Sequence, residues 1–352
     1  MRRVYGLILT LALLAGGCTG RMQEPDYRKH QASFFDLFDT LTIVIGYTES
    51  EAEFDRYADI IRLRMEELHR LYDIYHEYEG LNNLCTVNRQ AGIEPVAVDQ
   101  DIMDLLLAAR RACELSGGTV NAALGPVLRI WHDYRAAGLA DPGRAALPPM
   151  DNLRGAAAYT DMDDVIIDGD AGTVFLTKAG MSLDVGSIAK AYATGLAVQA
   201  AADAGMRSVL VSAGGNIVTA GAPLDGARDR WAIGIRDPDA PTADAYADIV
   251  FFNDLTLSCS GGYERYYTVD GQDYAHIIDP DTLMPANRFA QVAVIHEEPG
   301  LADWLSTALF ILPYEEGAAL AAQCGAEALW INRDGKWQST EGYAGISQTL
   351  GG

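Results

Sequence analysis

Hydrophobic residues recur every three or four positions between Glu51 and Tyr78, in a series that begins with Phe54, Tyr57 and Ile61. This spacing places them on one face of a helix, so it predicts a long amphipathic helix over 51–78. A second helix is predicted over Asp99–Ser116, with Asp99 as its N-cap and Gly117-Gly118 as its end. Two more are predicted, over Ser187–Ala204 before Gly205 and over Leu301–Leu312 before Pro313.

From Val165 onward the pattern changes to short β-rich runs. Val165–Ile167 and Thr173–Thr177 flank the turn Asp168–Gly172, which predicts a hairpin. Five further strands are predicted over Ser208–Ser212, Trp231–Arg236, Ala247–Phe252, Tyr263–Val269 and Gln291–His296. Strands with helices interposed indicate an α+β fold. The polar stretch Gly138–Gly155, which contains Pro and Gly, is predicted to be a linker.

The N-terminus carries the pattern of an export signal. Arg2 and Arg3 precede a short apolar run over Val4–Ala15, and two glycines and Cys18 follow. The run is too short to span a bilayer, which needs about 20 apolar residues. We predict a lipoprotein signal peptide over 1–17, a diacylated Cys18, a tether over 18–32 and one domain over 33–350. An ordinary signal peptide followed by an incidental cysteine is the alternative. The predicted location is the cell membrane, facing outside the cytoplasm.

Composition excludes several classes of protein. The chain has 352 residues, of which 49% are hydrophobic, and 49 acidic against 26 basic residues give a net charge of -23. Such an acidic surface argues against nucleic acid as a partner and against peripheral binding to anionic lipid. Four cysteines remain after Cys18 and are far apart, which favours buried thiols over a disulfide framework or a metal site. They are Cys85, Cys113, Cys259 and Cys324.

The common signatures of nucleotide, zinc-protease and serine-hydrolase sites are absent. Two glycine-containing segments are the first candidates. Leu183–Lys190 is predicted to join a strand to a helix, where backbone amides near Gly186 could bind phosphate with Lys190. An ordinary capped helix start is the alternative. Gly214-Gly215, between two strands, permit close approach to a ligand or simply make a turn.

Two further segments carry polar side chains. Ser260, Gly261 and Arg265 precede His276 and Asp279 by at most twenty residues, a dense cluster on a predicted hairpin. In the last predicted helix, Asp303 and Thr307 lie four residues apart and therefore on one face. One carboxylate with one hydroxyl suits Mg²⁺, which retains waters and binds substrate phosphates. The alternative is a helix N-cap at Asp303, with Thr307 bonding back to the helix.

Taken together, these segments resemble the ApbE family of FAD:protein FMN transferases. The family motifs are approximately D-x-G-x-x-x-K, A-G-G-[DN], S-G-x-Y-x-R, H-I-I-D-P-x-T-x-x-P-A and A-D-x-L-S-T-A. They correspond, in the family's order, to 184–190, 213–216, 260–265, 276–286 and 302–308. Gly117–Asn121 and Leu124–Pro126 look like a variant of a sixth, more N-terminal motif.

The resemblance implies a fold and a reaction. It implies mixed and antiparallel sheets with packed helices, and an FAD cleft between subregions. The reaction would be Mg²⁺-dependent transfer of FMN from FAD to a Thr or Ser hydroxyl of an exported redox protein, with release of AMP. His276 would be the general base and Asp279 would orient it or share that role. Mg²⁺ ligands would be Asp303, Thr307 and the backbone at Ser187.

The resemblance also implies the residues that bind FAD: Asp184, Gly186, Ser187, Lys190, Gly214, Gly215, Asn216, Ser260, Gly261, Arg265 and Ile278. Two other functions stay open. Water could replace the acceptor hydroxyl, which would make the protein an FAD pyrophosphatase that yields FMN and AMP. Alternatively, the chain could be a lipoprotein that binds flavin without turnover. Modification of the chain by its own activity is not predicted.

Overall fold

The structure is a computed structural model that describes residues 26–240, 242, 245–263 and 265–351. The predicted signal peptide and Cys18 lie outside these residues. None of the helices in the described part of the chain is long and apolar enough to cross a membrane.

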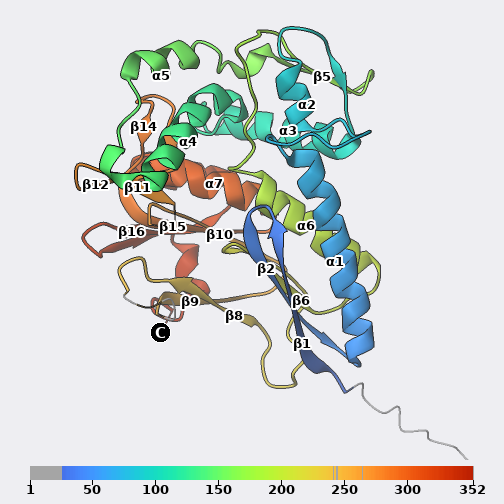
Figure 1. Ribbon diagram of the computed structural model, residues 1–352. Coiled ribbons are helices and arrows are strands. Elements are labelled where there is room, and N and C mark those ends of the chain that lie inside the picture. The colour runs from blue at the N-terminus through green and yellow to red at the C-terminus, as the bar shows by residue number, and fades with distance from the viewer. Residues whose placement is uncertain (1–25, 241, 243–244, 264, 352) are drawn as a thin grey trace, which may run out of the picture.

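A central sheet of eight strands, in which every neighbouring pair is antiparallel, organises the molecule (Figure 1). In spatial order the strands are β1 (Arg28–Leu37), β2 (Thr40–Thr48), β6 (Val209–Ala213), β7 (Asn216–Ala220), β10 (Thr256–Gly261), β15 (Phe289–His296), β16 (Glu327–Asn332) and β17 (Trp337–Ser339). This arrangement agrees with the predicted α+β fold.

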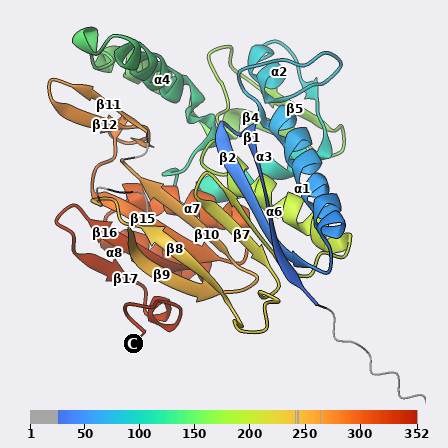
Figure 2. The same ribbon diagram turned by 60° about the horizontal axis from the view of Figure 1, so that its bottom comes forward.

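Both faces of the sheet are buried, as the alternation in β15 shows. Val292 and Val294 pack into the core on the helical side, whereas Ala293 and Ile295 belong to the core on the other side. Figures 1 and 2 show the long helices on one face and a hairpin on the other. The helices are α1 (Glu51–Tyr72), α6 (Ala189–Asp203), α7 (Pro299–Ile311) and α8 (Tyr314–Cys324), and the hairpin is β8 (Trp231–Arg236) with β9 (Tyr246–Phe252).

A second subregion has a hydrophobic core of its own. Trp131, Leu153 and Tyr267 are buried in that core, and the Trp131 indole donates to the carbonyl of Leu283 at 2.9 Å. Figure 2 shows its long helix and the β11–β12 hairpin projecting from the main body. Its elements are α4 (Gly125–Ala140), α5 (Met150–Ala157), β11 (Tyr266–Val269), β12 (Gln272–Ala275), β13 (Ile278–Asp279) and β14 (Met284–Pro285).

The remaining helices and strands pack into the same hydrophobic core as the C-terminal end of α1. A three-stranded sheet has the order β3-β5-β4 and contains the predicted hairpin. The helices and strands of this group are α2 (Leu84–Arg89), β3 (Val96–Ala97), α3 (Gln100–Leu115), β4 (Val165–Asp168) and β5 (Thr173–Leu176). Short 3₁₀ turns occur along the chain at Ala122–Leu124, Pro142–Arg144, Met162–Asp164 and Gly342–Gly345.

Local signals predicted several elements correctly. α3 begins after Asp99, whose Oδ1 accepts from the Asp101 amide at 2.9 Å, and Gly117 and Gly118 follow it with positive φ. The long helix ends earlier than predicted, at Tyr72. Asp73 terminates it, because its Oδ1 accepts from the amides of Tyr75 and His76 and so starts a turn.

Three predictions about organisation are wrong. The stretch 138–155 is not a linker, because α4 extends to Ala140 and α5 buries Leu153 completely. β1 begins at Arg28 and therefore includes the last five residues of the predicted tether. No strand precedes Gly186 directly within the described residues, and α6 begins only at Ala189.

The C-terminal segment is joined to the β8–β9 hairpin by a buried carboxylate. Asp248, 2% exposed, accepts from Tyr343 Oη at 2.9 Å, Ser347 Oγ at 2.6 Å and Thr349 Oγ1 at 2.9 Å. Burial raises the pKa of Asp248, but these donors outweigh it and hold the pKa below 3.8. The stabilisation by this network is therefore fully present at pH values above the pKa of an aspartate in the unfolded chain, about 3.9. It is lost as the pH falls through the lowered pKa of Asp248 in the folded protein.

We expect Asp248→Ala to lower the free energy of unfolding by about 2–4 kcal/mol, because it leaves several buried donors without an acceptor. Urea denaturation at pH 7 measures the change. Asp229→Ala, at a side chain that is 95% exposed, is the matched control and should change stability by less than about 0.5 kcal/mol. Equal effects of the two substitutions would contradict the stabilising role of Asp248.

Candidate active site

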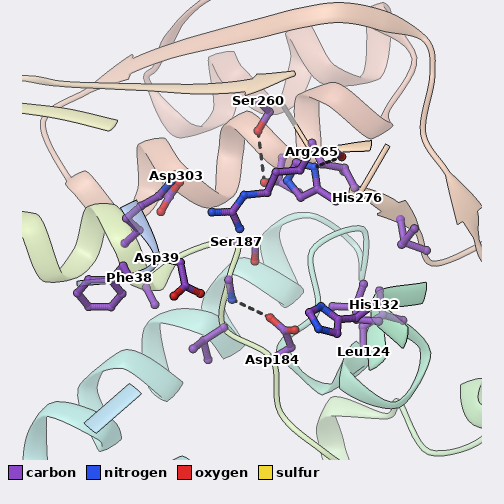
Figure 3. Close-up of a pocket in the computed structure, with 18 of the residues that line it drawn as sticks. Phe38, Asp39, Leu124, His132, Asp184, Ser187, Ser260, Arg265, His276 and Asp303 are labelled. Carbon is purple, nitrogen blue, oxygen red and sulfur yellow. Dashed lines mark hydrogen bonds between the residues drawn. The ribbon is translucent and has the colours of Figure 1, made fainter. Parts of the chain in front are cut away.

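A pocket of about 600 Å³ lies between the helical layer of the main sheet and the second subregion. This volume is within the usual range of small-molecule sites, about 300–1,000 Å³. Segments far apart in the sequence contribute to it, including the β1–β2 turn, the start of α6, the β6–β7 turn and α7. Figure 3 shows Asp39, Ser187 and Asp303, from three of these segments, around the pocket.

Asp303 lies inside α7, one turn after its start, and is only 7% exposed. Its Oδ1 accepts from Asn216 Nδ2 at 2.9 Å, and its Oδ2 accepts from the Ala191 amide at 3.0 Å. The alternative that Asp303 caps its own helix is wrong, because Glu298 occupies the N-cap position of α7. Asp303 instead caps the first turn of α6 from the neighbouring helix.

Burial raises the pKa of Asp303, although Lys190 and the two hydrogen bonds act to lower it. No ion pair in the described part of the chain includes this carboxylate. A buried carboxylate without a paired cation is costly, and a bound divalent ion would relieve that cost. Each oxygen has already accepted one hydrogen bond and retains a lone pair for a metal.

Two hydroxyls follow Asp303 in α7, those of Ser306 and Thr307, and the hydroxyl of Ser260 lies near both. Thr307, one turn later in α7, lines the pocket and is 3.5 Å from Ser260 Oγ. Ser306 Oγ donates to the Asp303 carbonyl at 2.8 Å and is 2.8 Å from Ser260 Oγ. The hydroxyl that bonds back to the helix is therefore that of Ser306, rather than that of Thr307 as the alternative reading required.

The donor set therefore fits Mg²⁺. One carboxylate and one hydroxyl on adjacent turns match an ion that takes few protein ligands and keeps its waters. The described residues contain no group of three or more His, Cys, Asp or Glu side chains that could hold a metal. This finding leaves the predicted site unchanged, because that site uses a single carboxylate. Ser187 also lines the pocket, on the segment before α6.

The β6–β7 turn and Lys190 form another part of the wall. Lys190 Nζ donates to the Gly214 carbonyl at 3.4 Å. Gly214 has φ +54°, and a Cβ there would lie 2.2 Å from Thr40 Oγ1, so this turn requires glycine. Gly215 also has positive φ but does not line the pocket.

The segment before α6 differs from the predicted phosphate loop. The Gly186 amide donates to Asp184 Oδ1 at 2.9 Å, and the Ala191 amide donates to Asp303. These two amides are therefore engaged by carboxylates rather than open to an anion. Burial raises the pKa of Asp184, while the Gly186 amide and His132 act to lower it. Asp184, Gly186 and Lys190 all line the pocket.

His276 has one ring nitrogen held by the backbone. Its Nδ1 is 3.2 Å from the Arg265 carbonyl, which also accepts from the His276 amide at 3.0 Å. Because a carbonyl can only accept, Nδ1 carries the proton and the neutral ring has its lone pair on Nε2. Burial, Arg265 and Arg135 lower the pKa of His276 to about 4, so the ring is neutral at pH 7.

Asp279 does not take the orienting role predicted for it. Its Oδ1 accepts from the Asp281 amide at 2.9 Å, which starts a turn, and the residue does not line the pocket. The Arg265 carbonyl holds the His276 ring instead. Ile278, by contrast, is buried and does line the pocket, as do Ser260, Gly261 and Asn216.

The pocket also contains residues that the sequence analysis missed. Phe38 and Asp39 come from the β1–β2 turn and have positive φ, and His132 and Arg135 come from α4. Cys259, to which no chemistry was assigned, lines the pocket as well. The acidic turn at 36–39 was the one signal for the first pair, whereas α4 overlaps the stretch interpreted as a linker.

Comparisons with known proteins identify the family of the chain. The model of the ApbE family matches residues 40–330, which include all five motifs that line the pocket. The chain belongs to the ApbE family. Its membership confirms the predicted family and the prediction that the chain is an enzyme, because the family's curated relatives are named as transferases.

Two relatives illustrate the similarity. A Treponema pallidum protein named FAD:protein FMN transferase is 32% identical over 96% of this chain and 93% of its own length. A Klebsiella pneumoniae protein of the same name is 30% identical over 75% of this chain and 82% of its own length.

Solved structures confirm the predicted α+β fold. The ApbE protein of Thermotoga maritima has a TM-score of 0.79 and 26% identity, covering 91% of this chain and 99% of that one. The apo form of the Pseudomonas stutzeri flavinyl transferase ApbE has a TM-score of 0.76 and 25% identity, covering 92% and 98%.

Proposed function

We propose that this chain is an FAD:protein FMN transferase that moves FMN from FAD to a Thr or Ser hydroxyl of an exported redox protein and releases AMP. The observation that carries the proposal is the convergence of all five ApbE motifs on one pocket in an ApbE-family chain. The pocket presents a buried carboxylate, cationic side chains and a neutral imidazole, the groups that phosphoryl transfer to an alcohol requires.

Asp303, Thr307 and the backbone at Ser187 are the proposed Mg²⁺ ligands. When bound, the ion neutralises phosphate charge and so eases attack on phosphorus. Asn216 and the Ala191 amide fix the Asp303 carboxylate through its two hydrogen bonds. Lys190 and Arg265 supply positive charge for the FAD diphosphate, which a chain of net charge -23 does not attract at long range.

His276 is the proposed general base. Its Nδ1 proton is held by the Arg265 carbonyl, so Nε2 can accept the proton of the acceptor hydroxyl as that oxygen attacks phosphorus. The new bond is the phosphoester between the acceptor oxygen and FMN, and the bond broken is the one that joins the two phosphates. AMP leaves with the electron pair of that bond.

The test is incubation of the purified chain with FAD and Mg²⁺, with and without a redox domain that presents a Thr. AMP release and the mass of the acceptor domain are measured. An acceptor heavier by one FMN unit, together with AMP, is the expected result. AMP and free FMN irrespective of the acceptor would replace the proposal with an FAD pyrophosphatase. Bound but intact FAD would replace it with a flavin-binding protein without turnover.

We also propose that the protein is anchored to the cell membrane by a lipid on Cys18 and faces outside the cytoplasm. The support is the basic start, the short apolar run and the small residues before Cys18. An exported location matches a reaction whose acceptor is an exported redox protein.

A further inference from the structure

Arg135 lines the pocket from α4, outside all of the motifs discussed above. It is half-buried, and its Nη2 lies 3.3 Å from His132 Nδ1. The His132 ring lies 5.8 Å from the ring of Tyr75 with an interplanar angle of 36°. Aromatic side chains thus orient this guanidinium, but they do not compensate its charge.

Arg265 provides a second guanidinium in the same pocket. Figure 3 shows it reaching between Ser260 and Ser187, opposite the wall that carries His132. Arg135 and Arg265 are the two arginines that line the pocket, and among the described residues neither has a carboxylate within ion-pair distance. Other arginines that have no ion pair in the described part of the chain, such as Arg111 and Arg129, lie outside the pocket. In a chain with 49 acidic residues, two uncompensated guanidiniums in one pocket indicate a bound anion.

The two side chains are close enough to affect each other. Burial and the charge of Arg265 both lower the pKa of Arg135, which is the effect of a like charge without an intervening acid. Both arginines also lower the pKa of His276. Bringing two guanidiniums together costs free energy, and an anion between them would recover it.

We propose that Arg135 and Arg265 form an anion site that binds a phosphate group of the nucleotide substrate on the α4 side of the pocket, apart from Asp303 and Thr307. The inference rests on the proposed function, in which FAD is the substrate. Guanidinium is suited to this task, because its planar N–H groups match two phosphate oxygens at once. The site would distinguish phosphorylated flavins from riboflavin.

The test compares Arg135→Gln and Arg135→Lys with Arg129→Gln in the purified full chain. Arg129 is an exposed residue of the same helix and does not line the pocket, so it is the matched control. Titration calorimetry measures binding of FAD, FMN, AMP and riboflavin. Thermal unfolding checks that each variant folds.

We expect Arg135→Gln to weaken FAD binding about 10- to 100-fold, the usual effect of losing a charge-assisted hydrogen bond. Riboflavin binding should change less than about twofold, and Arg135→Lys should restore part of the loss. A loss for FMN but not AMP assigns the site to the flavin-side phosphate, and a loss for AMP alone assigns it to the adenosine side. Arg129→Gln should bind all four compounds as the unmodified chain does.

Two results would overturn the inference. One is unchanged FAD affinity in Arg135→Gln, including the case in which only the KM for the acceptor protein rises. The other is an equal loss of riboflavin and FAD affinity, which would indicate a merely structural role. Failure of the proposed function is distinguishable from both, because it is read from the unmodified chain, which would then leave the acceptor domain without FMN whatever the affinities of the Arg135 variants.

Discussion

Replacing Asp303 by Ala is expected to lower AMP release and FMN transfer about 1,000-fold or more. A metal ion that neutralises phosphate charge contributes several kcal/mol to catalysis, and Asp303 is the one charged ligand proposed for it here. The Asp303 residue is only 7% exposed, and burial raises the pKa of its carboxyl. A bound cation would stabilise the ionised carboxylate against this cost of burial. The measurement is AMP release at saturating FAD over a range of Mg²⁺ concentrations, with an EDTA-treated sample of the unmodified chain beside it.

Loss of the metal must be separated from loss of the fold. Asp303→Asn keeps the volume of the side chain but removes its charge, so it should be almost as inactive as Asp303→Ala and unfold closer to the unmodified chain. Asp248→Asn is the matched control, because Asp248 is also a buried, multiply hydrogen-bonded carboxylate but lies outside the pocket. It should lose stability and retain turnover. Mg²⁺-dependent activity that survives in Asp303→Asn would contradict the metal-binding role.

Elements governed by local signals could be predicted from the sequence. α3 is an example, since its cap at Asp99 and its glycine stop are encoded within a few residues of the helix ends. β1 escaped prediction because it is an edge strand whose side chains, from Arg28 to Leu37, are mostly exposed and polar. Its pairing with β2 depends on the sheet, rather than on its own pattern.

The site was predictable as a set of motifs but not as a set of contacts. The sequence places Asp303 and Thr307 on one helix face, yet the bonds that fix Asp303 come from Asn216 and Ala191, 87 and 112 residues away. Likewise, the sequence suggested the Asp279 side chain as the partner of His276, whereas the structure supplies a backbone carbonyl. A sequence motif identifies functional side chains, but it does not show which backbone groups will contact them. Those contacts depend on the folded structure, as the Ala191 amide and the Arg265 carbonyl show.

Replacing His276 by Ala is expected to lower the rate of FMN transfer about 100- to 10,000-fold, the usual contribution of a positioned general base. FAD affinity should change little, because the neutral ring is proposed to act on the acceptor hydroxyl. His276→Gln should be equally impaired, since an amide cannot take up the proton. His296→Gln is the matched control: His296 accepts from the Glu298 amide at 3.0 Å and does not line the pocket. Full transfer by His276→Ala would remove this residue from the mechanism.

The same assignment predicts the acidic limb of the pH profile. The base is active when deprotonated, so the rate should rise with pH through the pKa of His276. In the free enzyme that pKa is lowered to about 4 by burial and by Arg265 and Arg135, and kcat/KM reports the free enzyme.

Bound FAD would neutralise part of the charge of these two arginines and so raise the pKa of His276 again, and kcat reports this bound state. We therefore expect the acidic limb of kcat to lie at higher pH than that of kcat/KM, and His276→Ala to lack both. If the limb of kcat/KM lay near 6.5, the ordinary value for histidine, the two arginines would not face His276 in solution as they do in this structure.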